Sequence, residues 1–106
     1  SPQTGFDCSG LIHYSYQQAL GIATPRTVKA IYSASYPNIE QQDLQPGDIV
    51  VFATNWKNKP DHAGIYVGKQ RFVHAPSSGG VVQIDPLNRG YWQKHFLTGK
   101  RVPTLH

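Results

Sequence analysis

The first regular alternation of hydrophobic and polar positions begins at Cys8 and predicts an amphipathic helix. Small or apolar side chains recur at spacings of three and four residues, which places them on one helical face: Cys8, Leu11, Ile12, Ser15 and Ala19. Asp7 precedes this face as a suitable N-cap, and Gly21 follows it as a stop signal. We therefore expect a helix of about three turns, with Cys8 as its first residue.

A second helix is predicted from Pro25 to about Ala34. Thr24 is its expected N-cap, and proline suits the first helical position because it lacks an N–H group. Pro37 ends this segment. The following sequence, Leu44-Gln45-Pro46-Gly47-Asp48, has proline and glycine at the central positions of a turn.

The second half of the chain consists of short β-branched and aromatic runs, which are typical of strands. The predicted strands cover residues 49–53, 62–67, 71–74, 81–84 and 100–102, and residues 91–96 fit either a short helix or an extended segment. The turn Gly68-Lys69-Gln70 joins two of these strands as a hairpin and sets Tyr66 near Phe72. Helices followed by closely connected strands predict an α+β fold with an antiparallel sheet.

Composition narrows the class of partner. The 106 residues fit one domain, and the net charge of +4 favours an anionic partner. The basic residues are dispersed rather than gathered into a run, so a nucleic-acid partner is not expected. No apolar stretch approaches the roughly 20 residues that cross a bilayer, so we expect no transmembrane segment.

Cys8 is the single cysteine of the chain, which excludes an internal disulfide. At a helix start, unpaired backbone N–H groups and the helix dipole favour a thiolate and lower the pKa of the thiol. The same N–H groups are natural donors to a developing oxyanion. The carboxylate of Asp7 opposes the thiolate charge. A lone cysteine is also a common buried structural residue, so both interpretations stay open at this point.

A reactive cysteine needs a base, and His62 and His74 are the best-placed histidines. His62 begins one predicted strand and His74 ends the next, so hairpin pairing would bring both imidazoles to one end of the sheet. In that arrangement His62 takes the thiol proton, while His74 accepts a hydrogen bond from the far ring nitrogen of His62. Zinc is the alternative for these residue types, but no closely spaced ligand pair is present, so no metal or cofactor is expected.

Four segments resemble the sequence motifs of the NlpC/P60 cell-wall cysteine peptidases. They occur in the family's order over almost the whole chain: Phe6-Asp7-Cys8-Ser9-Gly10-Leu11, Leu44-Gln45-Pro46-Gly47-Asp48-Ile49-Val50-Val51-Phe52, Asp61-His62-Ala63-Gly64-Ile65-Tyr66-Val67-Gly68 and Phe72-Val73-His74-Ala75-Pro76. Each motif is weak alone, and the ordered set is strong. The resemblance implies a papain-like fold in which the nucleophile helix packs on an antiparallel sheet.

The resemblance also implies an activity and a set of residues. The family hydrolyses peptidoglycan stem peptides, usually at the bond between γ-D-glutamate and diaminopimelate or lysine, through a thioester acyl-enzyme. By motif, Cys8 matches the nucleophile, His62 the base and His74 the orienting residue. Further matches are the substrate-contacting positions Asp7, Ser9 and Arg26.

The remaining expectations follow from the same resemblance. We expect residues 1–106 to form one catalytic domain without the family's first helix and its Arg-(Tyr/Trp)-Gly-Gly segment. We also expect a monomer in the cell envelope, whether periplasmic, anchored to the outer membrane or secreted. Two alternatives stay open: a thiol amidase or acyltransferase acting on another acyl group, and a catalytically inactive wall-binding module.

Overall fold

A computed structural model describes residues 8–75 and 82–103, with residues 8 and 9 described by their backbone alone. Its elements in chain order are α1 (Cys8–Leu20), α2 (Val28–Ser33), β1 (Asn38–Ile39), the 3-10 helix η1 (Gln41–Asp43), β2 (Ile49–Phe52), β3 (His62–Gly68), β4 (Arg71–His74), β5 (Gln83–Pro86), α3 (Gly90–His95) and β6 (Phe96–Lys100). The six strands form one sheet in the order β1-β6-β2-β3-β4-β5, and every neighbouring pair is antiparallel. This confirms the predicted α+β class.

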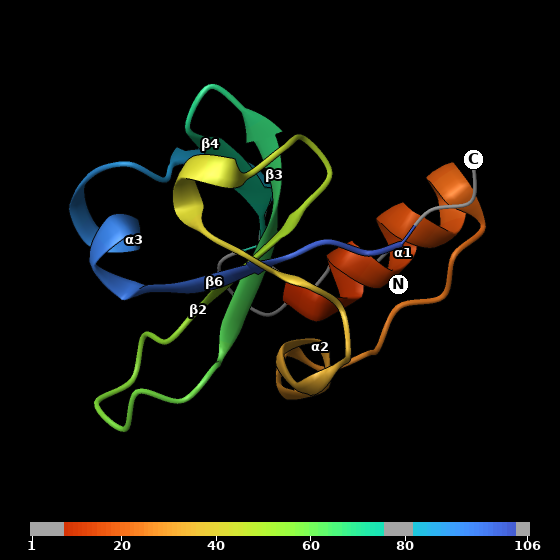
Figure 1. Ribbon diagram of the computed structural model, residues 1–106, viewed down its shortest axis with the longest axis horizontal. Coiled ribbons are helices and arrows are strands. Elements are labelled where there is room, and N and C mark those ends of the chain that lie inside the picture. Colours follow the sequence, from red (N-terminus) through yellow and green to blue (C-terminus); the bar gives the residue numbers. More distant parts are fainter. Residues whose placement is uncertain (1–7, 76–81, 104–106) are drawn as a thin grey trace.

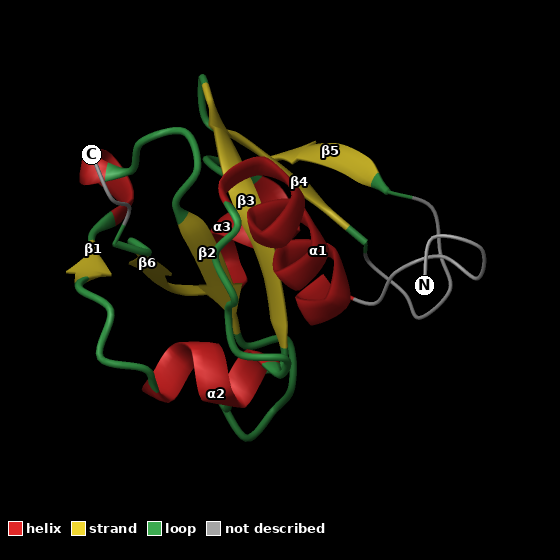
Figure 2. Cartoon of the chain, turned by 90° about the vertical axis from the view of Figure 1, so that its right-hand side faces the viewer, coloured by secondary structure: helices red, strands yellow, loops and turns green. Residues whose placement is uncertain are grey.

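The helices lie on two sides of the sheet. Figure 1 shows α1 and α2 on one side and α3 on the other, and Figure 2 shows α1 in front of β3 with α3 behind it. Alternate strand residues point to opposite faces, so β2 and β3 supply side chains to both layers. One layer packs the sheet against α1 and α2, and its buried members are Ile12, Tyr16, Val28, Ile31, Ile49, Val51, Ala63 and Val102. The other contains Val50, Phe52, Tyr66, Phe72 and Leu87, with Trp92 packed against them.

The first helix agrees with its sequence pattern at both ends. It begins at Cys8, and Gly21 follows it with a φ of 67°, a left-handed conformation that glycine adopts without steric cost. Leu11 and Ile12 of the predicted face are buried, but Ala19 of that face is exposed, and Tyr16, which was not assigned to it, is buried. The expected N-cap, Asp7, lies outside the described residues.

The second helix is shorter than predicted, and its N-cap is different. It begins at Val28, and the side chain of Thr27 accepts a hydrogen bond from the backbone N–H of Ala30 at 3.1 Å. Thr24, the residue expected to cap the helix, is instead buried. Both threonines suit the capping role by type, and only Thr27 has its side chain at the observed start.

Two strand assignments near the C-terminal end are corrected, and one open assignment is decided. The last strand is Phe96–Lys100 rather than residues 100–102. Of the two alternatives for residues 91–96, the helix is observed, at Gly90–His95. The strand expected at residues 81–84 is Gln83–Pro86, and residue 81 lies outside the described residues. The two-residue β1, which pairs with β6, was not predicted because an edge strand of that length leaves no periodic signal.

The Pro46-Gly47-Asp48 turn ties three parts of the fold together. The buried carboxylate of Asp48 accepts hydrogen bonds from the Gln45 backbone N–H and from two nitrogens of Arg101, Nε at 2.9 Å and Nη2 at 2.8 Å. The hydroxyl of Tyr16 in α1 donates to the carbonyl oxygen of Gly47. Burial, helped by the nearby Asp48 charge, raises the pKa of Tyr16 to about 12, so the hydroxyl stays protonated as this donor role requires. This turn fixes α1, the start of β2 and the end of β6 relative to one another.

Candidate active site

The β3–β4 hairpin brings His62 and His74 into direct contact. The strands pair with Tyr66 opposite Phe72, as predicted from the turn between them. With that register, the first residue of β3 and the last residue of β4 lie at the same end of the hairpin. His62 Nε2 lies 2.7 Å from His74 Nδ1. The expected contact between the two imidazoles is therefore present.

A third residue, Asp85, continues this contact and was missed by sequence reasoning. His74 Nε2 lies 2.7 Å from Asp85 Oδ2. The same oxygen accepts from Gln83 Nε2 at 2.6 Å, and the indole N–H of Trp92 also donates to this carboxylate. A signal existed, because Gln83 and Asp85 are polar residues two positions apart and share one face of a strand. The predicted strand ended at Ile84, which left Asp85 out.

Aromatic rings surround the two histidines. The ring of Trp92 stacks on His62, with centroids 5.0 Å apart and an interplanar angle of 25°, and meets His74 edge to face at 4.8 Å. The ring centroid of Phe52 lies 5.9 Å from that of His62, and the ring centroid of Phe72 lies 4.4 Å from that of His74. Trp92 packs against the core and at the same time covers the histidine pair.

Burial keeps both histidines in their neutral form. His74 is fully buried and His62 is 7% exposed. Loss of hydration disfavours the imidazolium and, with the neighbouring His74, lowers the pKa of His62 to about 4 against a weak opposing effect of Asp61. Burial also lowers the pKa of His74, although Asp85 counteracts it. Both rings are thus neutral at pH 7 in the described part of the structure, and a neutral imidazole is the form that accepts a proton.

Cys8 is placed by its backbone at the first position of α1, as predicted. Helix α1 packs against β3, the strand that His62 begins. Ser9 is the second residue of the helix, and Asp7 lies outside the described residues. Nothing in the described residues tests the roles expected of these three side chains, so the pairing of the Cys8 thiol with His62 stays a prediction.

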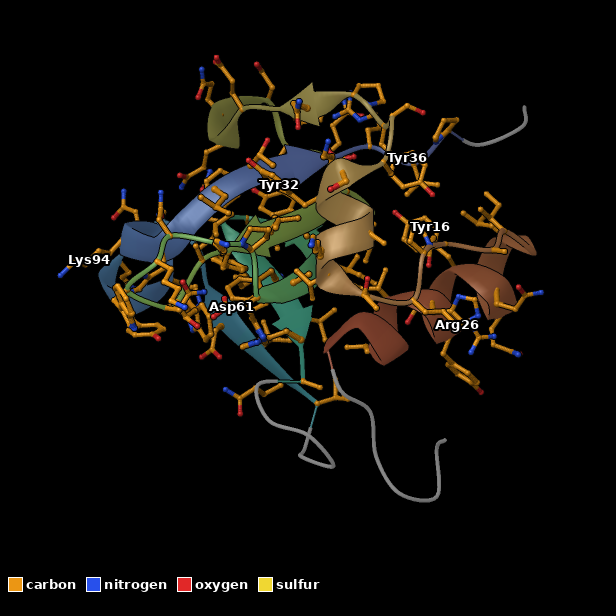
Figure 3. All side chains as sticks on the ribbon, turned by 90° about the horizontal axis from the view of Figure 1, so that it is seen from below. Tyr16, Arg26, Tyr32, Tyr36, Asp61 and Lys94 are labelled. Carbon is orange, nitrogen blue, oxygen red and sulfur yellow. The ribbon has the colours of Figure 1, made fainter. Side chains whose placement is uncertain are left out.

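Arg26 is exposed and lies apart from the histidines. Figure 3 shows it at the opposite side of the view from Asp61, the residue that precedes His62. Its predicted contact with substrate stays a prediction. Within residues 8–75 and 82–103, no group of three or more His, Cys, Asp or Glu side chains is arranged to hold a metal ion. Over the same part of the chain, no helix is both long and apolar enough to cross a membrane.

A helix that starts at a cysteine, packed on an antiparallel sheet that carries two hydrogen-bonded histidines at one end, defines a papain-like domain. The chain belongs to the NlpC/P60 family, whose model matches residues 1–101. It is 42% identical over 105 residues to the murein DD-endopeptidase MepH of Escherichia coli K12, which covers 98% of this chain and 39% of that protein. It is 43% identical over 101 residues to the gamma-DL-glutamyl hydrolase of Bacillus subtilis 168, covering 95% and 24%.

Solved structures agree with the fold. An NLP/P60 family protein similar to a lipoprotein, from Staphylococcus aureus Mu50, matches with a TM-score of 0.81 and 38% identity over 96% of this chain and 34% of that one. RipD of Mycobacterium tuberculosis, described as a non-catalytic NlpC/p60 domain protein adapted to peptidoglycan binding, matches with a TM-score of 0.73 and 28% identity over 93% and 68%. The chain spans well under half the length of MepH and of the gamma-DL-glutamyl hydrolase.

Proposed function

We propose that this chain is the catalytic domain of a peptidoglycan endopeptidase that acts in the bacterial cell envelope with Cys8 as nucleophile. The observation that carries the proposal is the buried contact between His62 Nε2 and His74 Nδ1 at 2.7 Å. This contact holds the His62 imidazole through Nε2, which leaves Nδ1 of His62 as the atom that exchanges a proton with the thiol. Membership of the NlpC/P60 family and the names of the relatives support the substrate class.

The chemistry follows from these groups. His62 Nδ1 takes the proton of Cys8, and the thiolate attacks the peptide carbonyl. Backbone N–H groups at the start of α1 donate to the oxyanion. His62 then protonates the departing amine, which leaves a thioester on Cys8. A water molecule that gives its proton to His62 hydrolyses this thioester and regenerates the thiol.

For the bond, we propose the one between γ-D-glutamate and diaminopimelate or lysine. The relatives named above differ here, since one is a DD-endopeptidase and the other a gamma-DL-glutamyl hydrolase. A second candidate function is non-catalytic wall binding, which the likeness to RipD favours. This chain has both a cysteine at the helix start and the hydrogen-bonded histidine pair, and a binding module needs neither.

A two-substrate assay with Cys8→Ala as the matched variant tests the proposal. One substrate is a stem peptide with a single γ-D-Glu–diaminopimelate bond, and the other is a DD-cross-linked dimer of stem peptides. We expect mass spectrometry to show cleavage of the first by the intact chain and none by the variant. Cleavage of the dimer alone would move the bond assignment to the DD class. Wall binding without cleavage of either substrate would support the binding module.

A further inference from the structure

Asp85 stands at the far end of a hydrogen-bonded series that begins at His62. We infer that Asp85 is a positioning residue that sets the tautomers of both histidines, so that Nδ1 of His62 carries a lone pair facing the proposed nucleophile. This inference rests on the proposed function. The observation behind it is the unbroken series His62 Nε2–His74 Nδ1–His74 Nε2–Asp85 Oδ2, with both separations at 2.7 Å.

The direction of each hydrogen bond follows from the carboxylate. An ionised carboxylate only accepts hydrogen bonds, so His74 Nε2 must donate to Asp85. A neutral His74 then has its lone pair on Nδ1, which must accept from His62 Nε2. His62 consequently has its proton on Nε2 and its lone pair on Nδ1. Asp85, the acceptor at the end of the series, therefore determines the tautomer of His62, two hydrogen bonds away.

The surroundings keep Asp85 in the acceptor state. Burial pulls the pKa of Asp85 upward, but hydrogen bonds from Gln83, His74 and Trp92 outweigh it, so the net pKa lies below its ordinary value. His74 is fully buried, which shields its ring nitrogens from exchange with bulk water. Trp92 contacts both ends of the series, since its ring stacks on His62 and its N–H group donates to Asp85.

An asparagine in place of Asp85 would no longer require His74 Nε2 to be the hydrogen-bond donor. Its amide both donates and accepts, so it can turn its NH₂ group toward His74 Nε2. That would place the His74 proton on Nδ1, which then donates to His62 Nε2 and forces the proton of His62 onto Nδ1. In that tautomer His62 presents an N–H group where a base is needed.

Asp85→Asn tests the inference with two independent readouts. In the stem-peptide assay we expect kcat to fall by about 10²-fold with little change in KM, while Asp43→Asn, on an exposed 3-10 helix, leaves both unchanged. In the Cys8→Ala background, ¹⁵N NMR at pH 7 should show His62 protonated at Nε2 with Asp85 present and at Nδ1 with asparagine. Thermal unfolding checks that Asp85→Asn remains folded.

The outcomes separate this inference from the proposed function. An unchanged His62 tautomer in Asp85→Asn overturns the inference, whether or not the chain cleaves peptidoglycan. A tautomer change with an inactive parent chain supports the inference and defeats the proposed function. A fall in kcat accompanied by a fall in the free energy of unfolding, with no tautomer change, would show a purely structural role.

A separate feature lies in the loop between β2 and β3, which leads directly into His62. Trp56 in this loop is 89% exposed, and the ammonium of Lys57 lies 5.3 Å from the centroid of its ring. Burial in the core, the usual reason for a tryptophan, therefore does not explain this residue. Lys59 adds a second cation to the same loop.

Polar side chains cross-link this loop through hydrogen bonds. The carboxylate of Asp61 accepts from the backbone and hydroxyl of Thr54 at 2.8 and 2.7 Å, and from Asn55 Nδ2 at 3.0 Å. Asn55 also bridges to Lys59, donating to its carbonyl oxygen at 2.7 Å and accepting from its N–H group at 3.2 Å. Trp56 is thus presented by an ordered support, which lowers the entropy cost of binding through it.

The geometry points to this loop as a contact for the glycan strand of the substrate. The flat indole suits stacking against a sugar ring, and Lys57 and Lys59 suit the carboxylates that hang from a peptidoglycan strand. The net charge of +4 is complementary to such an anionic polymer. This inference also rests on the proposed function, and it concerns the sugar chain rather than the bond that is cleaved.

Trp56→Ser tests it by comparing substrates with and without glycan. In the Cys8→Ala background, we expect about tenfold weaker co-sedimentation with purified sacculi, while Leu20→Ser, which removes another exposed apolar side chain, has no effect. With Cys8 present, kcat/KM on a glycan-free stem peptide should be unchanged by Trp56→Ser. Undiminished binding to sacculi, or an equal loss on the glycan-free peptide, would overturn the inference.

Discussion

Replacing His62 by alanine is expected to lower kcat for stem-peptide cleavage by about 10³-fold. The variant lacks the only group proposed to take the proton from Cys8 and return it to the leaving amine. His74 cannot substitute, because it is fully buried and its two nitrogens already face His62 and Asp85. Single-turnover kinetics on a γ-D-Glu–diaminopimelate peptide would measure the loss.

His13→Ala is the matched control for this prediction. His13 also makes a side-chain hydrogen bond, from Nδ1 to the carbonyl oxygen of Thr24 at 2.9 Å, and it lies outside the proposed proton path. We expect its kcat to remain within about twofold of the parent chain, a change of roughly 0.4 kcal/mol. Retention of most activity by His62→Ala would remove His62 from the mechanism, and with it the role argued for Asp85.

Gly64→Ala is expected to damage both stability and activity. A Cβ atom at this position would lie 2.7 Å from the carbonyl oxygen of Val73, 2.8 Å from Phe72 Cδ2 and 3.0 Å from His74 Cβ. The first contact is with backbone, so β3 and β4 must separate locally. We expect the free energy of unfolding to fall by about 2–3 kcal/mol, as is typical of overpacked sites, and kcat to fall because His74 is displaced from His62. Thermal unfolding and the peptide assay measure these two effects.

Gly99→Ala separates the two consequences. Its nearest contact, at 2.6 Å, is Leu44 Cδ2, the end of a flexible side chain, and the next is the carbonyl oxygen of Ile39 at 3.0 Å, in the two-residue edge strand β1. Both neighbours yield more easily than the β3–β4 ladder, so we expect a smaller loss of stability and an unchanged kcat. Similar losses of activity in both variants would show that Gly64 acts through stability alone.

Local sequence patterns predicted the parts of the site that depend on one segment. Helix α1 begins at Cys8 because the apolar spacing and Gly21 specify its start and end within one stretch of chain. The contact between His62 and His74 followed from the short turn between β3 and β4, because hairpin register is fixed by the turn that connects its strands. Motif order then indicated the NlpC/P60 family, which the family model confirms.

Other local choices were ambiguous because the residue types were equivalent. Thr24 and Thr27 are both good caps, and tertiary packing buried the first and left the second free to bond Ala30. Lys100 is one of the basic residues dispersed along the sequence. It is buried, with Nζ donating to the carbonyl oxygens of Ala34 and Tyr36, so it contributes to packing and not to an anion-binding surface.

The sequence by itself determined helix α1, the histidine hairpin and the fold class, since each depends on short-range periodicity or on a turn. Only the tertiary structure decided that Asp85 ends the hydrogen-bonded series and that Trp92 covers it. Asp85 reaches His74 because β5 pairs with β4, and Trp92 reaches both through the packing of α3 on the sheet. Such contacts arise from pairing between separate elements, and hydrophobic periodicity within one segment carries no information about them.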